Sequence, residues 1–147
     1  FYMNGTGVYK AEILDKDHYD QIVAQSVQLS NGGSSPKLEL VYLPGGTIKK
    51  GDTFTIINNN GSAPVQGTFN GLPEGAEFAV DGATFKISYV GGDGNDVVLT
   101  AQNDSTGPKA PNTGGENVAV NLAGTIVGVA SAAILLFMAK RKSFGKK

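Results

Sequence analysis

Residues 50–100 read KGDTFTIINNNGSAPVQGTFNGLPEGAEFAVDGATFKISYVGGDGNDVVLT. Apolar side chains alternate with polar ones at Phe54 and Ile56, at Phe78 and Val80, and at Phe85, Ile87 and Tyr89. Turn signals separate these runs: Asn60-Gly61, Asn70-Gly71, Asp81-Gly82 and the glycine-rich segment 91–94. A period of two between such corners is typical of short strands. The stretch therefore predicts an all-β fold.

The same pattern continues towards the N-terminus, with alternating apolar residues at 9, 11 and 13 and again at 38, 40 and 42. Ile22 and Ala24 share one parity and Val27 and Leu29 the other, which predicts a corner near residues 25–26. Periodicity alone leaves a sandwich, a barrel and a β-helix open. We expect strands throughout residues 1–100, and a long helix only near residues 118–142.

Four blocks within residues 50–100 resemble a repeat module found near the C-terminal end of large bacterial surface proteins. These are autotransporter-type passengers and other parallel β-helix proteins. The blocks are GDTF at 51–54, GTF at 67–69, GLPEG at 71–75 and GGDGNDV at 91–97, with HYDQ at 18–21 as an upstream step. The resemblance implies the terminal rungs of a right-handed parallel β-helix, closed by antiparallel capping hairpins. It also implies that an upstream region, before Phe1, binds an unknown extracellular ligand.

Residues 118–139, VAVNLAGTIVGVASAAILLFMA, carry no charged side chain. A helix of that length spans about 33 Å, enough to cross a bilayer core of about 30 Å. Lys140, Arg141 and Lys142 follow directly and predict a membrane stop, with the C-terminus in the cytoplasm and the body outside. The alternative is a buried core helix, but such a helix normally carries a polar stripe.

The residues Ala110, Pro111, Asn112, Thr113 and Gly114 precede this span. Motif, apolar span and basic tail together resemble the cell-wall sorting signal of Gram-positive surface proteins, whose pattern is Leu-Pro-x-Thr-Gly. Ala110 stands where the family has leucine, which bears on the class of sortase that reads it. The resemblance implies that a sortase cleaves between Thr113 and Gly114 and joins Thr113 to peptidoglycan. The mature protein would then be extracellular and wall-anchored, and its membrane contact would be transient.

Composition limits the chemistry that the chain can perform. It has no cysteine and one histidine, which excludes thiolate metal sites, disulfides and multi-histidine centres. The first 139 residues hold seven basic and thirteen acidic side chains, so they lack the cationic surface of a nucleic-acid-binding protein. Residues 101–117 contain no large apolar side chain and are expected to be a flexible linker.

Four patterns within residues 1–100 could carry chemistry, and each has a simpler structural interpretation. Residues 91–99 match one copy of the GGxGxDxUx calcium repeat, but calcium sits between successive copies. A single copy is therefore read as a hairpin turn with Asp93 and Asp96 in solvent. The other three patterns are a His18 cluster with Asp15, Asp17 and Asp20, a Glu74/Glu77 pair, and the aromatics Tyr42, Phe54, Phe69, Phe78, Phe85 and Tyr89. We interpret them as a polar turn, an exposed turn and a strand core, so we expect no catalytic residue, metal or cofactor.

The sequence thus predicts four parts: a β stalk or cap at 1–100, a linker with the sorting motif at 101–117, a transmembrane helix at 118–139 and a basic tail at 140–147. The expected function is the C-terminal segment of an adhesin-like surface protein that is anchored by sortase. Two alternatives remain open. One is the anchor region of an extracellular polysaccharide-acting β-helix enzyme, because fold alone does not decide function. The other is a plain single-pass membrane anchor.

Overall fold

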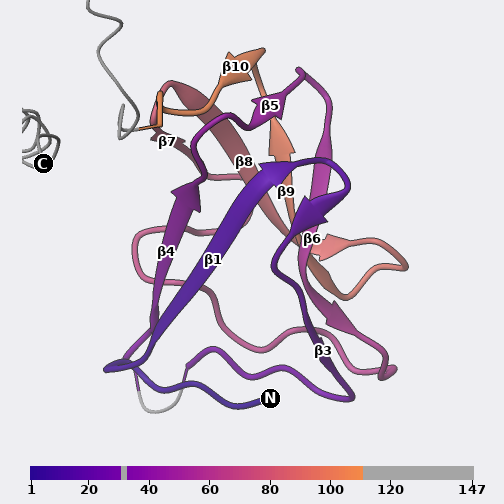
Figure 1. The fold of residues 1–147 in the computed structure, drawn as a ribbon. Coiled ribbons are helices and arrows are strands. Elements are labelled where there is room, and N and C mark those ends of the chain that lie inside the picture. The colour runs from indigo at the N-terminus through magenta and orange to yellow at the C-terminus, as the bar shows by residue number, and fades with distance from the viewer. Residues whose placement is uncertain (31–32, 111–147) are drawn as a thin grey trace, which may run out of the picture. The chain divides into compact units, whose positions relative to one another are not determined.

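A computed structural model describes residues 1–30 and 33–110, and every regular element in these ranges is a β-strand (Figure 1). The strands are β1 (Val8–Asp15), β2 (His18–Tyr19), β3 (Ile22–Ala24), β4 (Lys37–Tyr42), β5 (Thr47–Ile48), β6 (Thr53–Asn59), β7 (Glu77–Val80), β8 (Ala83–Gly91), β9 (Asp96–Ala101) and β10 (Ser105–Thr106). The all-β prediction is therefore confirmed for the part of the chain that the structure describes. The helix expected near residues 118–142 lies outside the described ranges.

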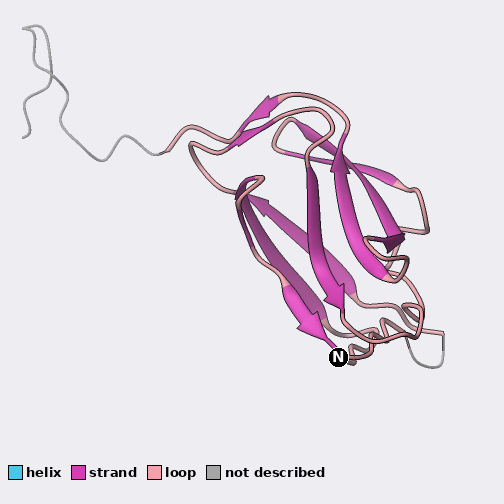
Figure 2. Ribbon diagram, turned by 90° about the vertical axis from the view of Figure 1, so that its right-hand side faces the viewer, coloured by secondary structure: helices cyan, strands magenta, loops and turns pink. Residues whose placement is uncertain are grey.

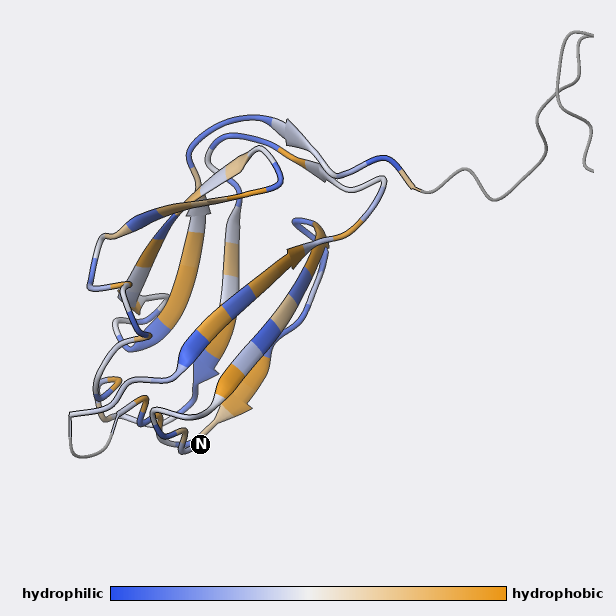
Figure 3. Ribbon diagram, turned by 90° about the vertical axis from the view of Figure 1, so that its left-hand side faces the viewer, coloured by the Kyte–Doolittle hydropathy of each residue, from blue (hydrophilic) through white to orange (hydrophobic). Residues whose placement is uncertain are grey.

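The first sheet has the order β2-β1-β4. Its strands β1 and β4 run parallel, from Val8 opposite Lys37 to Ile13 opposite Tyr42. Successive side chains of a strand point to opposite faces, and Figure 3 shows the resulting hydrophilic and hydrophobic bands along these two strands. The inward side chains of β1 are buried, as the alternation predicts.

The second sheet is mixed, with the order β3-β6-β9-β8-β7. Only the β3–β6 pair is parallel. The register of β6 shifts between Thr55 and Ile57, and both Ile56 and Ile57 are fully buried. A bulge of this kind re-aims a side chain, so it turns two consecutive isoleucines into the core. Simple alternation from Phe54 does not predict the second one.

Parallel pairing recurs between segments that lie at similar separations along the sequence. Tyr2 pairs with Gln28, which pairs in turn with Gln66. The β1–β4 and β3–β6 registers join residues 29 and 35 positions apart. The described residues nevertheless form mixed sheets rather than a regular solenoid, because the antiparallel strands β7, β8 and β9 follow.

The core lies between the two sheets, whose strands form two facing layers in Figure 2. Aromatic rings connect the layers. The Tyr19 ring on β2 meets Phe54 on β6 edge-on across the layers, with ring centroids 5.4 Å apart, and within the second sheet Phe54 meets Phe85 on β8 at 5.9 Å. Edge-to-face pairs at such distances add to the stabilisation that burial of the rings already provides.

The turn between β7 and β8 follows directly from its sequence. Asp81 and Gly82 have φ angles of 47° and 84°, and Val80 pairs with Ala83 across the turn. A two-residue hairpin of this type requires positive φ at both central positions, which Asp-Gly supplies readily. The turn expected at these two residues is confirmed.

The folded body continues beyond Thr100, which is the boundary that the sequence predicts. Strand β9 includes Ala101, and β10 pairs antiparallel with β5. Two polar side chains of this segment hydrogen-bond to backbone groups of the folded body. Asn103 Oδ1 accepts the Thr84 N–H at 2.8 Å, and Asp104 Oδ1 accepts the Lys50 N–H at 2.8 Å. A linker composition is therefore misleading where Asn and Asp side chains bind neighbouring backbone groups.

Candidate functional site

The sorting motif lies at the edge of the described structure. Ala110 is the last described residue and is exposed. Pro111, Asn112, Thr113 and Gly114 lie outside the described residues, as do the apolar segment 118–139 and the stop residues Lys140, Arg141 and Lys142. Within residues 1–30 and 33–110, no helix has the length and apolarity needed to cross a bilayer.

The chain leaves the body through a small set of hydrogen bonds beside β5. Tyr42 Oη donates to the Ser105 carbonyl at 2.9 Å, and the Gly107 N–H donates to the Gly46 carbonyl at 2.8 Å. The last backbone contact is the Gly45 N–H, which donates to the Pro108 carbonyl at 3.3 Å. Residues 108–110 are exposed. The motif therefore starts two residues after the last described anchoring contact.

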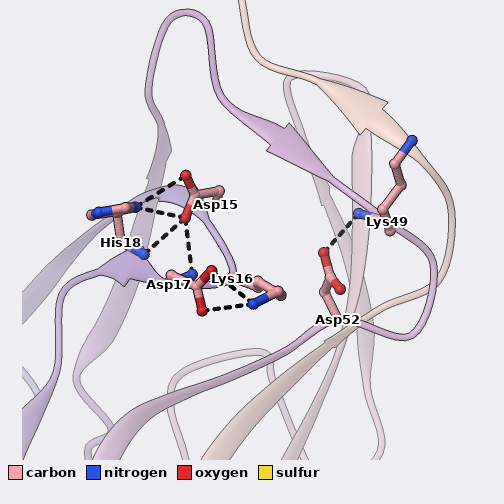
Figure 4. A network of polar contacts seen from close by, with 6 residues as sticks. All are labelled: Asp15, Lys16, Asp17, His18, Lys49 and Asp52. Carbon is pink, nitrogen blue, oxygen red and sulfur yellow. Dashed lines mark hydrogen bonds and ion pairs between the residues drawn. The ribbon is translucent and has the colours of Figure 1, made fainter.

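The His18 cluster is a turn held by one carboxylate (Figure 4). Asp15 Oδ1 accepts the N–H groups of Asp17 and His18, both at 2.9 Å, and contacts His18 Nδ1 at 2.9 Å. The Asp17 N–H and the His18 side chain lower the pKa of the Asp15 carboxyl, because both favour its charged form. The Asp20 carboxylate has a different partner and accepts the Glu12 N–H at 3.0 Å. The interpretation as a polar surface turn is confirmed.

Glu74 and Glu77 serve different parts of the sheet. Glu74 Oε2 accepts the N–H of Tyr89 on β8 at 2.6 Å, so this carboxylate fastens the Pro-Glu-Gly turn to the strand. Glu77 lies at the start of β7, opposite Lys86. Glu74 therefore has a structural role through its hydrogen bond to Tyr89. Both glutamates are exposed rather than enclosed in a cleft.

The loop at residues 91–96 differs from the expected solvated turn. Asp93 is exposed, but only 7% of Asp96 is accessible, and its Oδ1 accepts the Asn59 N–H at 2.8 Å. Asn95 is also buried, and its Nδ2 donates to the Gly61 carbonyl at 2.6 Å. The expectation that Asp96 faces solvent is therefore wrong, because its carboxylate is buried and binds the Asn59 N–H at the end of β6. The single calcium-like repeat therefore connects its own loop to the loop that begins at Asn59, through the hydrogen bonds of Asn95 and Asp96.

We expect this loop to bind calcium weakly or not at all, because no group of three His, Cys, Asp or Glu side chains comes together among the described residues. Titrating Ca²⁺ to 1 mM into residues 1–111 should shift the melting temperature by less than about 1 °C, since a ligand stabilises only the state that it binds. Asn95 Oδ1 is buried and has no hydrogen-bond partner among the described residues. A rise of many degrees that Asn95→Ala abolishes would show that this loop is a calcium site.

The aromatic side chains form a core and not a sugar-stacking platform. Five of the six are buried, and Phe78 is half-buried against the cluster. Tyr89 Oη donates to the Leu72 carbonyl at 2.7 Å and accepts the Phe69 N–H at 2.9 Å. Burial raises the pKa of Tyr89 to about 12, and burial followed by the charge of Asp20 raises that of Tyr9 to about 12. Both phenols therefore stay neutral and hold backbone groups.

No family model, curated protein or solved structure matches this chain at a significant level.

Proposed function

We propose that this chain is the C-terminal segment of a secreted, non-catalytic bacterial surface protein that a sortase joins to the cell wall at Thr113. One observation carries the proposal: the motif at residues 110–114, the uncharged segment 118–139 and the basic cluster 140–142 follow one another in the order that anchoring requires. Each element alone is a weak signal.

The order has a mechanical reason. Five cationic side chains at residues 140–147 resist crossing the membrane, because a charge at the bilayer centre costs roughly 2.5–3.5 kcal/mol even on insertion scales. Export then stalls with the motif just outside the membrane. Pro111 disfavours the helical region for Ala110, which suits an enzyme cleft that binds the motif in extended form.

The covalent step is an acyl transfer. The sortase cysteine sulfur attacks the Thr113 carbonyl carbon, the Thr113–Gly114 amide bond breaks, and Gly114 leaves as a protonated amine. An amine of the wall peptide then attacks the thioester and releases the thiol. Thr113 thereby becomes the C-terminal residue of the anchored protein, linked to the wall through a new amide bond.

The exit geometry sets how close this chemistry comes to the body. Thr113 is five residues beyond Pro108, whose carbonyl makes the last described backbone contact. Five extended residues span at most about 17 Å. The exposed residues 108–110 therefore form a short connection between the folded body and the motif, so the enzyme would bind the motif close to the body.

For the body, we propose that residues 1–26 and 27–60 are the last two rungs of a right-handed parallel β-helix, here called the first and second rungs. The antiparallel strands β7, β8 and β9 would be its closing cap. The parallel pairings of Tyr2 with Gln28, of β1 with β4 and of β3 with β6 support this, because these three join first-rung segments to second-rung segments. A stalk of this type suits a protein that displays an upstream binding region away from the wall.

Removing residues 140–147 tests the stalling step. We expect the truncated protein to appear mainly in the culture medium, because the apolar segment alone no longer holds it at the membrane. A truncation that removes only Lys146 and Lys147 is the matched control and should remain in the wall fraction. Immunoblots of medium, wall and membrane fractions measure the outcome. Normal wall anchoring of the longer truncation would contradict the proposed role of Lys140, Arg141 and Lys142.

A further inference from the structure

Strand β1 is paired with β4 along one edge, whereas β2 covers only the C-terminal end of its other edge. The Gly7 carbonyl accepts the Lys37 N–H at 2.9 Å, and the Ile13 carbonyl accepts the Leu43 N–H at 2.8 Å. Backbone groups of alternate residues face opposite edges of a strand. The odd-numbered residues of β1 therefore face β4, and Val8, Lys10 and Glu12 face the other edge.

That second edge is occupied only at its end. The Asp20 N–H donates to the Glu12 carbonyl at 2.9 Å, and the Asp20 carboxylate accepts the Glu12 N–H. The N–H groups of Val8 and Lys10 donate no hydrogen bond to any described residue. Two backbone donors in the middle of β1 are thus available for another strand.

The other two strand segments of the first rung, around Tyr2 and at β3, also have one backbone edge without a partner strand. The Phe1 carbonyl accepts the Gln28 N–H at 3.0 Å and the Met3 N–H donates to the Gln28 carbonyl at 3.0 Å, so the backbone of Tyr2 points away from the second rung. Strand β3 is the outermost strand of its sheet, with β6 on one side. The Ala24 carbonyl accepts the Asn60 N–H, so Val23 faces the free side.

The side chains at this end are also less covered than those one rung further on. Phe1 and Met3 are half-buried, whereas the residues one rung later, Val27 and Leu29, are 3% and 0% exposed. Ile22 is half-buried, and its register partner Ile57 is fully buried. The apolar interior therefore reaches the surface at the first rung.

This free edge of the first rung also lacks the features that usually prevent a sheet edge from pairing with another chain. Natural sheet edges carry charges, prolines or bulges that prevent pairing with other chains. Here Tyr2, Val8 and Val23 have 52–59% of their side chains exposed, and Lys10 is the only charged residue among the four edge positions. An edge of this length and polarity is an aggregation hazard unless another strand layer covers it.

We propose that this free edge, formed by Tyr2, Val8, Lys10 and Val23, is the docking surface for one further parallel β-rung, contributed by the same polypeptide before Phe1. The Phe1 N–H donates to the Ser26 carbonyl, so Phe1 lies beside the point where the chain passes from the first rung to the second. A segment entering at Phe1 therefore lies on the free side. This inference rests on the β-helix part of the proposed function and is independent of Thr113.

A tandem duplication tests the proposal. Tyr2 and Gln28 are 26 residues apart, so placing a second copy of residues 1–26 directly before residues 1–111 supplies a rung in register. Residues 1–111 form one compact unit and serve as the host. In the duplicated protein, the amides of the original Tyr2, Val8, Lys10 and Val23 should exchange with solvent about 100-fold more slowly than in residues 1–111 alone.

A scrambled 26-residue extension of the same composition is the control and should leave these amides in fast exchange. Equal exchange rates for the duplicated and scrambled extensions would overturn the proposal. So would slow exchange in residues 1–111 alone that depends on protein concentration, because a second copy would then be the occupant. Neither result touches wall anchoring, since the assay contains no sorting motif and no sortase.

Discussion

Replacing Thr113 with alanine is expected to move nearly all of the protein from the wall fraction to the membrane fraction. In the proposed mechanism the sortase places the Thr113 carbonyl against its cysteine, and threonine is the residue that the sorting-signal pattern has at this position. Without cleavage, the apolar segment 118–139 stays attached and the chain remains in the bilayer. Muralytic digestion followed by immunoblotting of the released and membrane-bound protein gives the ratio directly.

Asn112→Ala is the matched control, because residue 112 occupies the free position of the motif and precedes the scissile residue. It should retain most wall anchoring. Equal wall attachment of the Thr113→Ala and Asn112→Ala proteins would remove Thr113 from the mechanism. Equal retention of both in the membrane, with the unchanged chain retained as well, would favour a plain single-pass anchor.

The second large effect concerns the core of the body. Phe85→Ala should destabilise residues 1–111 by about 3–5 kcal/mol, because it leaves a cavity between the sheets. Phe85 is fully buried and its ring meets both Phe54 and Phe78 at 5.9 Å. Urea unfolding monitored by circular dichroism measures the change in the free energy of unfolding.

Phe78→Ala removes the same side chain from β7, where it is half-buried, and should cost about half as much. The comparison separates packing between the sheets from the general loss of an aromatic residue. A smaller loss for Phe85→Ala than for Phe78→Ala would show that the interior does not lie between the two sheets.

Much of the strand content was predictable, because inward residues alternate with outward ones on β1, β4 and β8 and because Asp81-Gly82 matches the turn that it forms. The burial of Ile57 was not predictable, since the bulge that causes it depends on the pairing of β6 with β9. Strand pairing is a property of segments distant in sequence, and alternation within one segment carries no information about it.

The polar residues show a second limit. Asp96 and Asn103 are in sequences typical of turns and linkers, yet each binds a backbone group 37 or 19 residues away. Nothing local distinguishes such a residue from a solvated one. Glu74 is similar, because its partner on Tyr89 becomes visible only after β8 has folded against the Pro-Glu-Gly turn.

The proposed sorting site stays a prediction from the sequence, because its residues from Pro111 onward lie outside the described residues. A sorting signal is read as an extended segment, so its residues, their order and their distance from the apolar segment carry the information. The structure adds the exposure of Ala110 and the contact of Pro108 with Gly45, which place the end of the body just before the motif. The boundary expected at Thr100 lacked this detail.

The most direct measurement is mass spectrometry of peptides from purified cell walls after muralytic digestion. The proposal predicts C-terminal peptides that end at Thr113 and carry a wall-peptide fragment on the Thr113 carbonyl, with no peptide from residues 114–147. Intact peptides that cross the Thr113–Gly114 bond in mature surface protein, from cells with an active sortase, would contradict it.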